Sequence, residues 1–163
     1  FAHINGNLID HLKGTRDMLA SWSASQTLQD AGLYHAAYGT AGFEAQMVAP
    51  DQRTKIAQII GPNSEEIVYQ YCACDRDTVW PQLGPVSSPD FKNRFTQQTY
   101  ILSTELLKDF CELTAANELE IAQGNTQFID QHGRGLFTLF THMQPLLSSK
   151  ANAAVKRAFG HYK

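Results

Sequence analysis

Residues 31–40 read AGLYHAAYGT, and our interpretation of the chain starts from this stretch. It places one histidine, His35, among small and apolar residues, and a Gly-Thr pair closes it. The spacing of the apolar residues predicts a helix over about 27–38. A histidine in such a helix is either a hydrogen-bonded core residue or a metal ligand, and the stretch alone leaves both interpretations open.

Helical spacing of apolar residues continues through most of the chain. A first helix begins near Leu8 with Asn5 or Asn7 as its cap, and Ser64 is expected to cap a fourth helix that reaches Asp75. The other predicted helices cover about residues 51–60, 103–124 and 125–143, with a last one that opens at 148 or 149. We therefore predict an all-α fold, a single-domain helical bundle over residues 1–163.

The segment from Asp77 to Gln98 contains three prolines and has no clear period. It is expected to be a loop, and it is a candidate cover for a pocket. From Phe91 onward the sequence is expected to be helical scaffold, in which His132, His142 and His161 have no assigned role.

The charge is balanced, with 13 Lys and Arg against 16 Asp and Glu, and no run of like charge stands out. Nucleic acid and anionic membranes are therefore not expected as partners, whereas a small-molecule ligand is. No stretch approaches the roughly 20 apolar residues of a membrane span. The oligomeric state is left open.

Three cysteines, Cys72, Cys74 and Cys111, are expected to be buried reduced thiols. Two of them are two positions apart in a predicted helix and so point in different directions, which disfavours a shared metal or disulfide. Reduced thiols favour a reducing compartment, so a cytoplasmic location is expected. Because the chain begins with Phe1, a cleaved leader peptide stays open.

Two histidines and a carboxylate are the candidate metal ligands. His11, His35 and Asp75 come from three predicted helices, which can converge inside a helical bundle. Imidazole and carboxylate ligands suit zinc, iron or manganese. The alternative is that the histidines are satisfied core residues and that Asp75 is a polar helix end. No HxxxH or HExxH pair supports the metal interpretation.

Aromatic and basic residues near these positions are candidates for ligand binding. Tyr34 and Tyr38 could line a pocket beside the histidines or belong to the core. Arg76 could hold an anionic group of a substrate or pair with Asp75.

Three motifs carry a resemblance to known proteins: NLIDHLKGTRDMLASWSA at 7–24, AGLYHAAYGT at 31–40 and YCACDRD at 71–77. Together they resemble an uncharacterised family of small helical proteins, over about the first half of the chain. Their order is also similar to that of a diverged HD-domain protein. That superfamily has a histidine on one helix, a His-Asp pair on the next, and a later aspartate.

The HD-like resemblance implies a divalent metal held by His11, His35 and Asp75. The aspartate of the His-Asp pair is replaced here by Ala36, which argues against a two-metal mechanism. His3 could supply a replacement ligand, one metal could be held more weakly, or the metal could be lost and a small-molecule pocket retained.

The resemblance leads to three functional hypotheses. The first is a metal-dependent hydrolase acting on a small phosphorylated or anionic substrate. The second is a non-catalytic binding or interaction module with a degenerate HD site. The third is an iron-dependent oxygenase.

Overall fold

The structure is a computed structural model, which describes residues 2–3, 6–41 and 45–162. Within these ranges the chain forms eight α-helices, short 3-10 turns and two small antiparallel hairpins. The helices are α1 (Leu8–Ser21), α2 (Gln26–Tyr34), α3 (Arg53–Ile60), α4 (Pro62–Ala73), α5 (Arg76–Val79), α6 (Thr104–Ala122), α7 (Thr126–His142) and α8 (Ser149–Phe159). The 3-10 turns are η1 (Trp80–Gln82), η2 (Gln144–Leu146) and η3 (Gly160–Tyr162), and the hairpins pair β1 (Ala2–His3) with β2 (Gly6–Asn7) and β3 (Phe91–Lys92) with β4 (Thr99–Tyr100).

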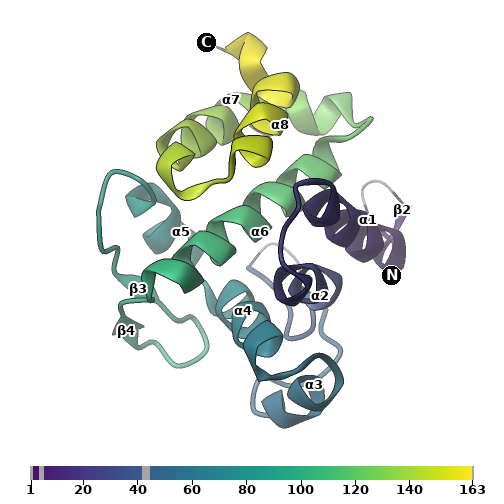
Figure 1. The fold of residues 1–163 in the computed structure, drawn as a ribbon, viewed down its shortest axis with the longest axis vertical. Helices are drawn as coiled ribbons and strands as arrows, with labels where there is room; N and C mark the ends of the chain where they lie inside the picture. Colours follow the sequence, from purple (N-terminus) through teal and green to yellow (C-terminus); the bar gives the residue numbers. More distant parts are fainter. Residues whose placement is uncertain (1, 4–5, 42–44, 163) are drawn as a thin grey trace.

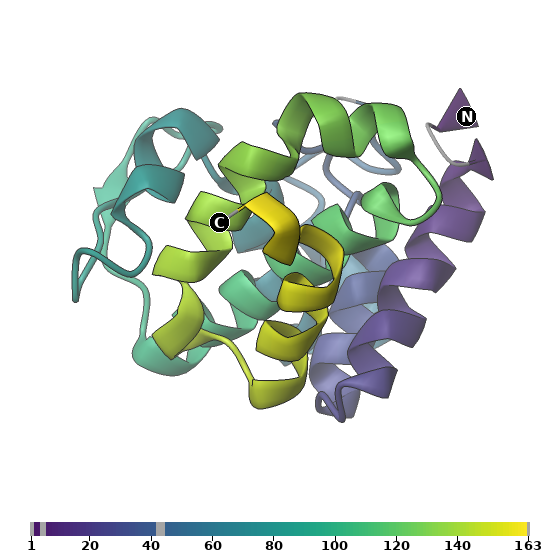
Figure 2. The ribbon, with the colours of Figure 1, turned by 90° about the horizontal axis from the view of Figure 1, so that it is seen from above.

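The long helix α6 is the centre of the fold (Figure 1). Helices α1, α2 and α4 pack on one side of it, and α7 and α8 pack on the other. Seen from above, α1 and the α5 segment lie on opposite sides of the α7–α8 pair (Figure 2). Every residue from Cys111 to Leu119 is buried, because neighbouring helices surround this part of α6. In a helix that is buried on all sides, polar side chains are expected only where they have hydrogen-bond partners.

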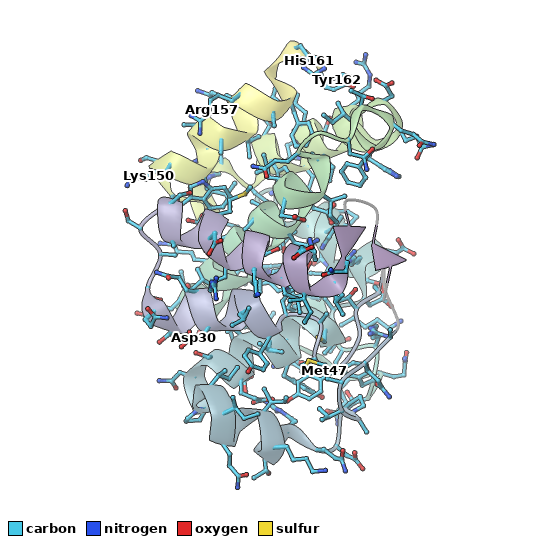
Figure 3. The ribbon with its side chains drawn as sticks, turned by 90° about the vertical axis from the view of Figure 1, so that its right-hand side faces the viewer. Asp30, Met47, Lys150, Arg157, His161 and Tyr162 are labelled. Carbon is cyan, nitrogen blue, oxygen red and sulfur yellow. The ribbon has the colours of Figure 1, made fainter. Side chains whose placement is uncertain are left out.

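Helices α1 and α2 run side by side across one face of the molecule (Figure 3). They approach closely at Gly32, where an added Cβ would lie 2.7 Å from Cδ1 of Leu19 and would force that side chain to shift. The N-cap prediction for α1 is confirmed at Asn7, whose side chain accepts a hydrogen bond from the Asp10 backbone N–H at 2.9 Å. The alternative cap, Asn5, lies outside the described residues.

Two predicted helix ends differ from the structure. Helix α2 ends at Tyr34 rather than near residue 38, because residues 35–39 continue in tight turns. Helix α4 begins at Pro62, whose fixed φ suits the first position of a helix. Ser64 is therefore not a cap, and its buried hydroxyl instead donates to the Thr27 carbonyl oxygen at 2.8 Å.

The segment predicted as a loop over 77–98 contains short ordered elements. Helix α5 and η1 form at its start, and β3 pairs with β4 in the register Phe91–Tyr100 and Lys92–Thr99. The spacing of apolar residues could not reveal elements of two to four residues, because such elements are too short for a pattern to repeat.

The three cysteines are buried and free, as predicted. None of the helices built from the described residues combines the length and the apolar character that crossing a membrane demands.

Candidate functional site

Two buried histidines meet where α1 and α2 pack together. His11 lies in the first half of α1, and His35 is the residue that ends α2. Their side chains are 4% and 2% exposed, and their Nε2 atoms lie 3.2 Å apart. Of the predicted convergence of His11, His35 and Asp75, the part that concerns the two histidines is confirmed.

The other ring nitrogen of each histidine is fixed by an acceptor. His35 Nδ1 donates to the Gly32 carbonyl oxygen at 2.7 Å, and His11 Nδ1 is hydrogen-bonded to the Glu120 carboxylate. A carbonyl oxygen can only accept, so the proton of a neutral His35 ring is on Nδ1 and its Nε2 presents a lone pair. Complete burial, with a further contribution from His11, lowers the pKa of His35 to about 3, so this ring is neutral at neutral pH.

Helix α6 brings an amide to the same point. Asn117 Oδ1 lies 2.9 Å from His11 Nε2, while its Nδ2 donates to Glu118 Oε1 at 3.3 Å. An amide oxygen and the two Nε2 atoms are all acceptors when each ring carries its proton on Nδ1. Acceptors in such contact need a cation between them, which is either a proton on His11 Nε2 or a metal ion.

The donor set fits one divalent transition metal ion. Bonds of 2.0–2.1 Å in tetrahedral geometry place neighbouring nitrogen ligands about 3.3 Å apart, close to the separation of the two Nε2 atoms. Metal-binding histidines also donate their second N–H to a carboxylate or a backbone carbonyl, as His11 and His35 do. The described residues contain no group of three or more His, Cys, Asp or Glu side chains suited to a metal, and the third polar atom beside the two Nε2 atoms is the amide oxygen of Asn117.

Asp75 does not join the histidines, which corrects the predicted ligand set. Its carboxylate caps α5 by accepting from the Thr78 backbone N–H at 3.3 Å, and Lys92 Nζ lies 3.5 Å from it. These partners turn Asp75 toward the β3 strand and away from the cavity described below. His3 lies in β1, and its side chain is outside the described part of the structure.

An open cavity of about 1220 Å³ leads to the histidine pair. Its polar end contains His11, His35, Asn117, Glu118 and Arg76. Its remaining wall comes from α6, α7 and the α5–η1 segment, including Trp80 and Pro81. Of the segment 77–98, which is the candidate cover, the described residues that line the cavity are Asp77, Trp80 and Pro81. The lining includes further polar residues outside this polar end, among them Asp77, Gln131 and His132. A concave site that combines apolar and polar side chains is typical of small-molecule binding.

Arg76 lines this cavity, as predicted for a ligand-binding residue. Its Nη2 donates to the Tyr71 hydroxyl at 3.2 Å, and its Nη1 lies 4.0 Å from Glu118 Oε1. Burial works against the charged form of Arg76, but Tyr71 and Glu118 outweigh it and raise its pKa. Burial also raises the pKa of the Glu118 carboxyl.

Tyr34 and Tyr38 are not among the residues that line the cavity, which corrects their predicted role. Tyr38 is buried, and its hydroxyl donates to Glu65 Oε1 at 2.6 Å in the α4 region. Tyr34 is half-buried against the core. The turn after α2 directs these tyrosines away from the histidine side.

The sequence analysis missed the contribution of α6 and α7. Asn117 and Glu118 follow Leu113 and Thr114 at helical spacing, so they belong to the apolar face of α6. Polar residues at core positions are the signal that could have revealed them. The part of the chain after Phe91 is mainly helical, as expected, but it is more than scaffold, since His132 and His142 also line the cavity.

Comparison with known proteins gives one family match. Residues 1–76 match the family described as Domain of unknown function (DUF6817). This segment contains α1 to α4 and both histidines, whereas Asn117 and the α7 wall lie beyond it. The search of curated proteins and the search of solved structures found no match.

Proposed function

We propose that the protein binds one divalent transition metal ion through His11 Nε2, His35 Nε2 and Asn117 Oδ1. The observation that carries the proposal is the convergence of these three acceptor atoms while both Nδ1 atoms are held by Glu120 and Gly32. Imidazole nitrogen suits zinc and iron, and a carbonyl-type oxygen such as that of Asn117 suits manganese. The order of the two histidines on neighbouring helices supports the HD-like assignment.

The reaction that suits this arrangement is hydrolysis of a small anionic substrate. A bound ion would lower the pKa of a coordinated water toward about 7 and polarise a substrate oxygen. Arg76 holds the anionic group, because its guanidinium faces the same cavity. Glu120 keeps the His11 ring oriented, and the walls of α6 and α7 limit access of water to the substrate.

A non-catalytic binding module is the second candidate. The observation that favours it is the absence of a carboxylate ligand at the two positions where the resemblance implies one. Ala36 has no carboxylate, and Asp75 pairs with Lys92. An iron-dependent oxygenase is the third possibility, and iron loading tests it.

The first experiment is isothermal titration of untagged, chelator-treated protein with Zn²⁺, Mn²⁺ and, without oxygen, Fe²⁺. We expect one ion per chain, at least tenfold weaker binding in His35→Ala and in Asn117→Ala, and no change in His161→Ala, which removes an exposed histidine of η3. If the folded wild-type protein binds none of these ions, the metal proposal is contradicted, and a hydrogen on His11 Nε2 rather than a metal ion lies between the three atoms.

Activity is then tested on the loaded protein. A panel of phosphate esters detects hydrolysis, and oxygen uptake by the iron-loaded protein detects an oxygenase. Metal binding without turnover in either assay favours the binding module.

A further inference from the structure

We propose that the cavity takes an amphipathic organic monoanion, with its single negative charge at Arg76 and its apolar body along α7 over Gly135. This inference rests on the proposed function for the position of the reacting end at the histidines. It adds the substrate class, which the metal site alone leaves open.

The guanidinium of Arg76 is mostly buried and has donor capacity left for a ligand. Its side chain is 19% exposed and carries five N–H donors. Among the described residues, its one hydrogen bond is to the Tyr71 hydroxyl, because Glu118 at 4.0 Å is beyond hydrogen-bond distance. The guanidinium also lies 4.9 Å from the Trp80 ring centroid, which holds it in place at the cavity wall. A guanidinium that is fixed at a cavity wall and has N–H donors without a protein partner is suited to bind a carboxylate or a similar anion.

The neighbouring charge limits the ligand to one negative charge. Glu118 is 6% exposed and lines the cavity beside Arg76. Asp77 lines the cavity too, and Arg76 is the one Arg or Lys among the described lining residues. A monoanion can pair with its guanidinium, whereas a second negative charge on the ligand would meet these acidic neighbours with no further guanidinium or ammonium group to pair with. A carboxylate or a phosphodiester is therefore favoured over a phosphate monoester.

One stripe of α7 forms a long wall of the cavity. Among the α7 residues that line the cavity, five recur at intervals of three and four residues along the helix: Phe128, His132, Gly135, Leu139 and His142. Residues at these intervals share one face of a helix. Phe128, Leu136 and Leu139 supply apolar surface on this wall, and Ile121 of α6 adds to it, whereas Gln131, His132, Thr138 and His142 supply polar surface. An apolar body of a ligand would bury surface against this stripe.

Gly135 stands in the middle of the stripe, and protein packing does not account for it. A Cβ at Gly135 would meet no atom within 4 Å. Gly133, two residues earlier, is different, because a Cβ there would lie 2.5 Å from Cε2 of Tyr162, the η3 residue labelled in Figure 3. A glycine inside a helix costs about 1 kcal/mol relative to alanine. Gly133 makes room for Tyr162, whereas Gly135 leaves room in the cavity.

The test is calorimetric titration of chelator-treated protein with decanoate, decylamine and decyl phosphate at pH 8. We expect decanoate to bind at least tenfold more tightly than decylamine or the doubly charged decyl phosphate. Arg76→Gln should weaken decanoate binding at least tenfold, with Arg76→Lys intermediate because it keeps the charge without the planar fork. Gly135→Leu should weaken it at least tenfold by filling the path along α7.

Two matched controls lie on α7 and do not line the cavity: Arg134→Gln removes an exposed charge, and Gln127→Leu adds exposed apolar volume. Both should bind decanoate as the wild type does. Equal affinity for decylamine or decyl phosphate, or unchanged affinity in Arg76→Gln or Gly135→Leu, would overturn the inference. Repeating the titration with zinc present separates the two proposals. If the protein binds decanoate but not zinc, only the proposed metal function is contradicted. If it binds zinc but not decanoate, only the proposed monoanion ligand is contradicted.

Discussion

At the scale of single residues, the position after His35 is informative. Ala36 is 4% exposed and lines the cavity, directly beside the histidine that the metal proposal uses. The HD-like resemblance implies an aspartate at this position. A methyl group there leaves the site with neutral ligands only, which weakens its hold on a cation.

Ala36→Asp should therefore strengthen metal binding. We expect at least tenfold tighter Zn²⁺ binding by competition with a chelator, because the carboxylate adds a charged ligand. The metal-free variant should be less stable than wild type, since a new carboxylate in a buried position is costly without a partner. Ala36→Asn, with the same shape and no charge, is the control and should give a smaller gain. Unchanged zinc affinity in Ala36→Asp would show that residue 36 does not reach the ion.

A pH-dependent contribution to stability lies far from the cavity, between α3 and α4. Arg53 Nη2 lies 2.7 Å from both Glu65 Oε2 and Glu66 Oε2, and Gln70 Nε2 donates to Glu66 Oε1 at 2.7 Å. Partial burial acts to raise the pKa of Glu66, but the hydrogen bonds from Gln70 and Arg53 lower it overall. A carboxyl whose pKa is lower in the folded state stabilises the fold above its unfolded pKa of about 4.3.

This stabilisation should be lost as the pH falls through the folded-state pKa of Glu66. Glu66→Gln is expected to lower the free energy of unfolding at pH 7 by less than about 1 kcal/mol, because the side chain is 42% exposed. The difference in the free energy of unfolding between the variant and the wild type should become smaller below pH 4. Urea unfolding at several pH values measures it, with Asp130→Asn, an exposed site on α7, as the control. A difference that stays constant with pH would contradict this assignment.

The sequence could predict His11 and His35 because their motifs are local and their helices follow each other in the chain. It could not predict Asn117, since the pairing of α1 with α6 joins residues 106 positions apart. Asp75 was misassigned for a related reason. A helix-end aspartate suits both metal binding and capping, and only the tertiary position of Lys92 decides between them.

At the scale of elements, the long helices were predictable and the short connections were not. Helices α6 and α7 have strong periodicity and caps at Ser103 and Asn125, both of which accept a hydrogen bond from the first turn. The turn that follows η1 depends instead on a contact with α7. Gly84, with φ of +97°, packs against the end of α7, where a Cβ would lie 1.8 Å from the His142 carbonyl oxygen.

Gly84→Ala should therefore destabilise the protein by at least about 2 kcal/mol, from backbone strain and the collision with α7. Gly124→Ala is the matched control, because Gly124 has φ of +66° but open space around its Cβ. We expect Gly124→Ala to cost less, since it adds strain without a collision. Chemical unfolding of both variants measures the difference. Equal losses in the two variants would mean that the contact with α7 contributes nothing.

At the scale of the whole molecule, the site joins parts of the chain that the family match separates. His11 and His35 belong to the matched segment 1–76, whereas Asn117 belongs to the central helix beyond it. A ligand that contacts all three ties α1 and α2 to α6. Anything that binds the folded state and not the unfolded chain stabilises the folded state by mass action.

Zinc should therefore raise the stability of the whole fold. At a free concentration of 100 times Kd the expected gain is about 2.7 kcal/mol, which corresponds to roughly 5–10 °C in Tm for a chain of this size. Asn117→Ala should lose most of this gain, because α6 then contributes no ligand, whereas His161→Ala should keep it. Thermal unfolding followed by circular dichroism, with and without zinc, measures these shifts. If Asn117→Ala keeps the full shift, the ion is bound by the α1–α2 pair alone, and α6 serves the cavity through Glu118 and its apolar wall.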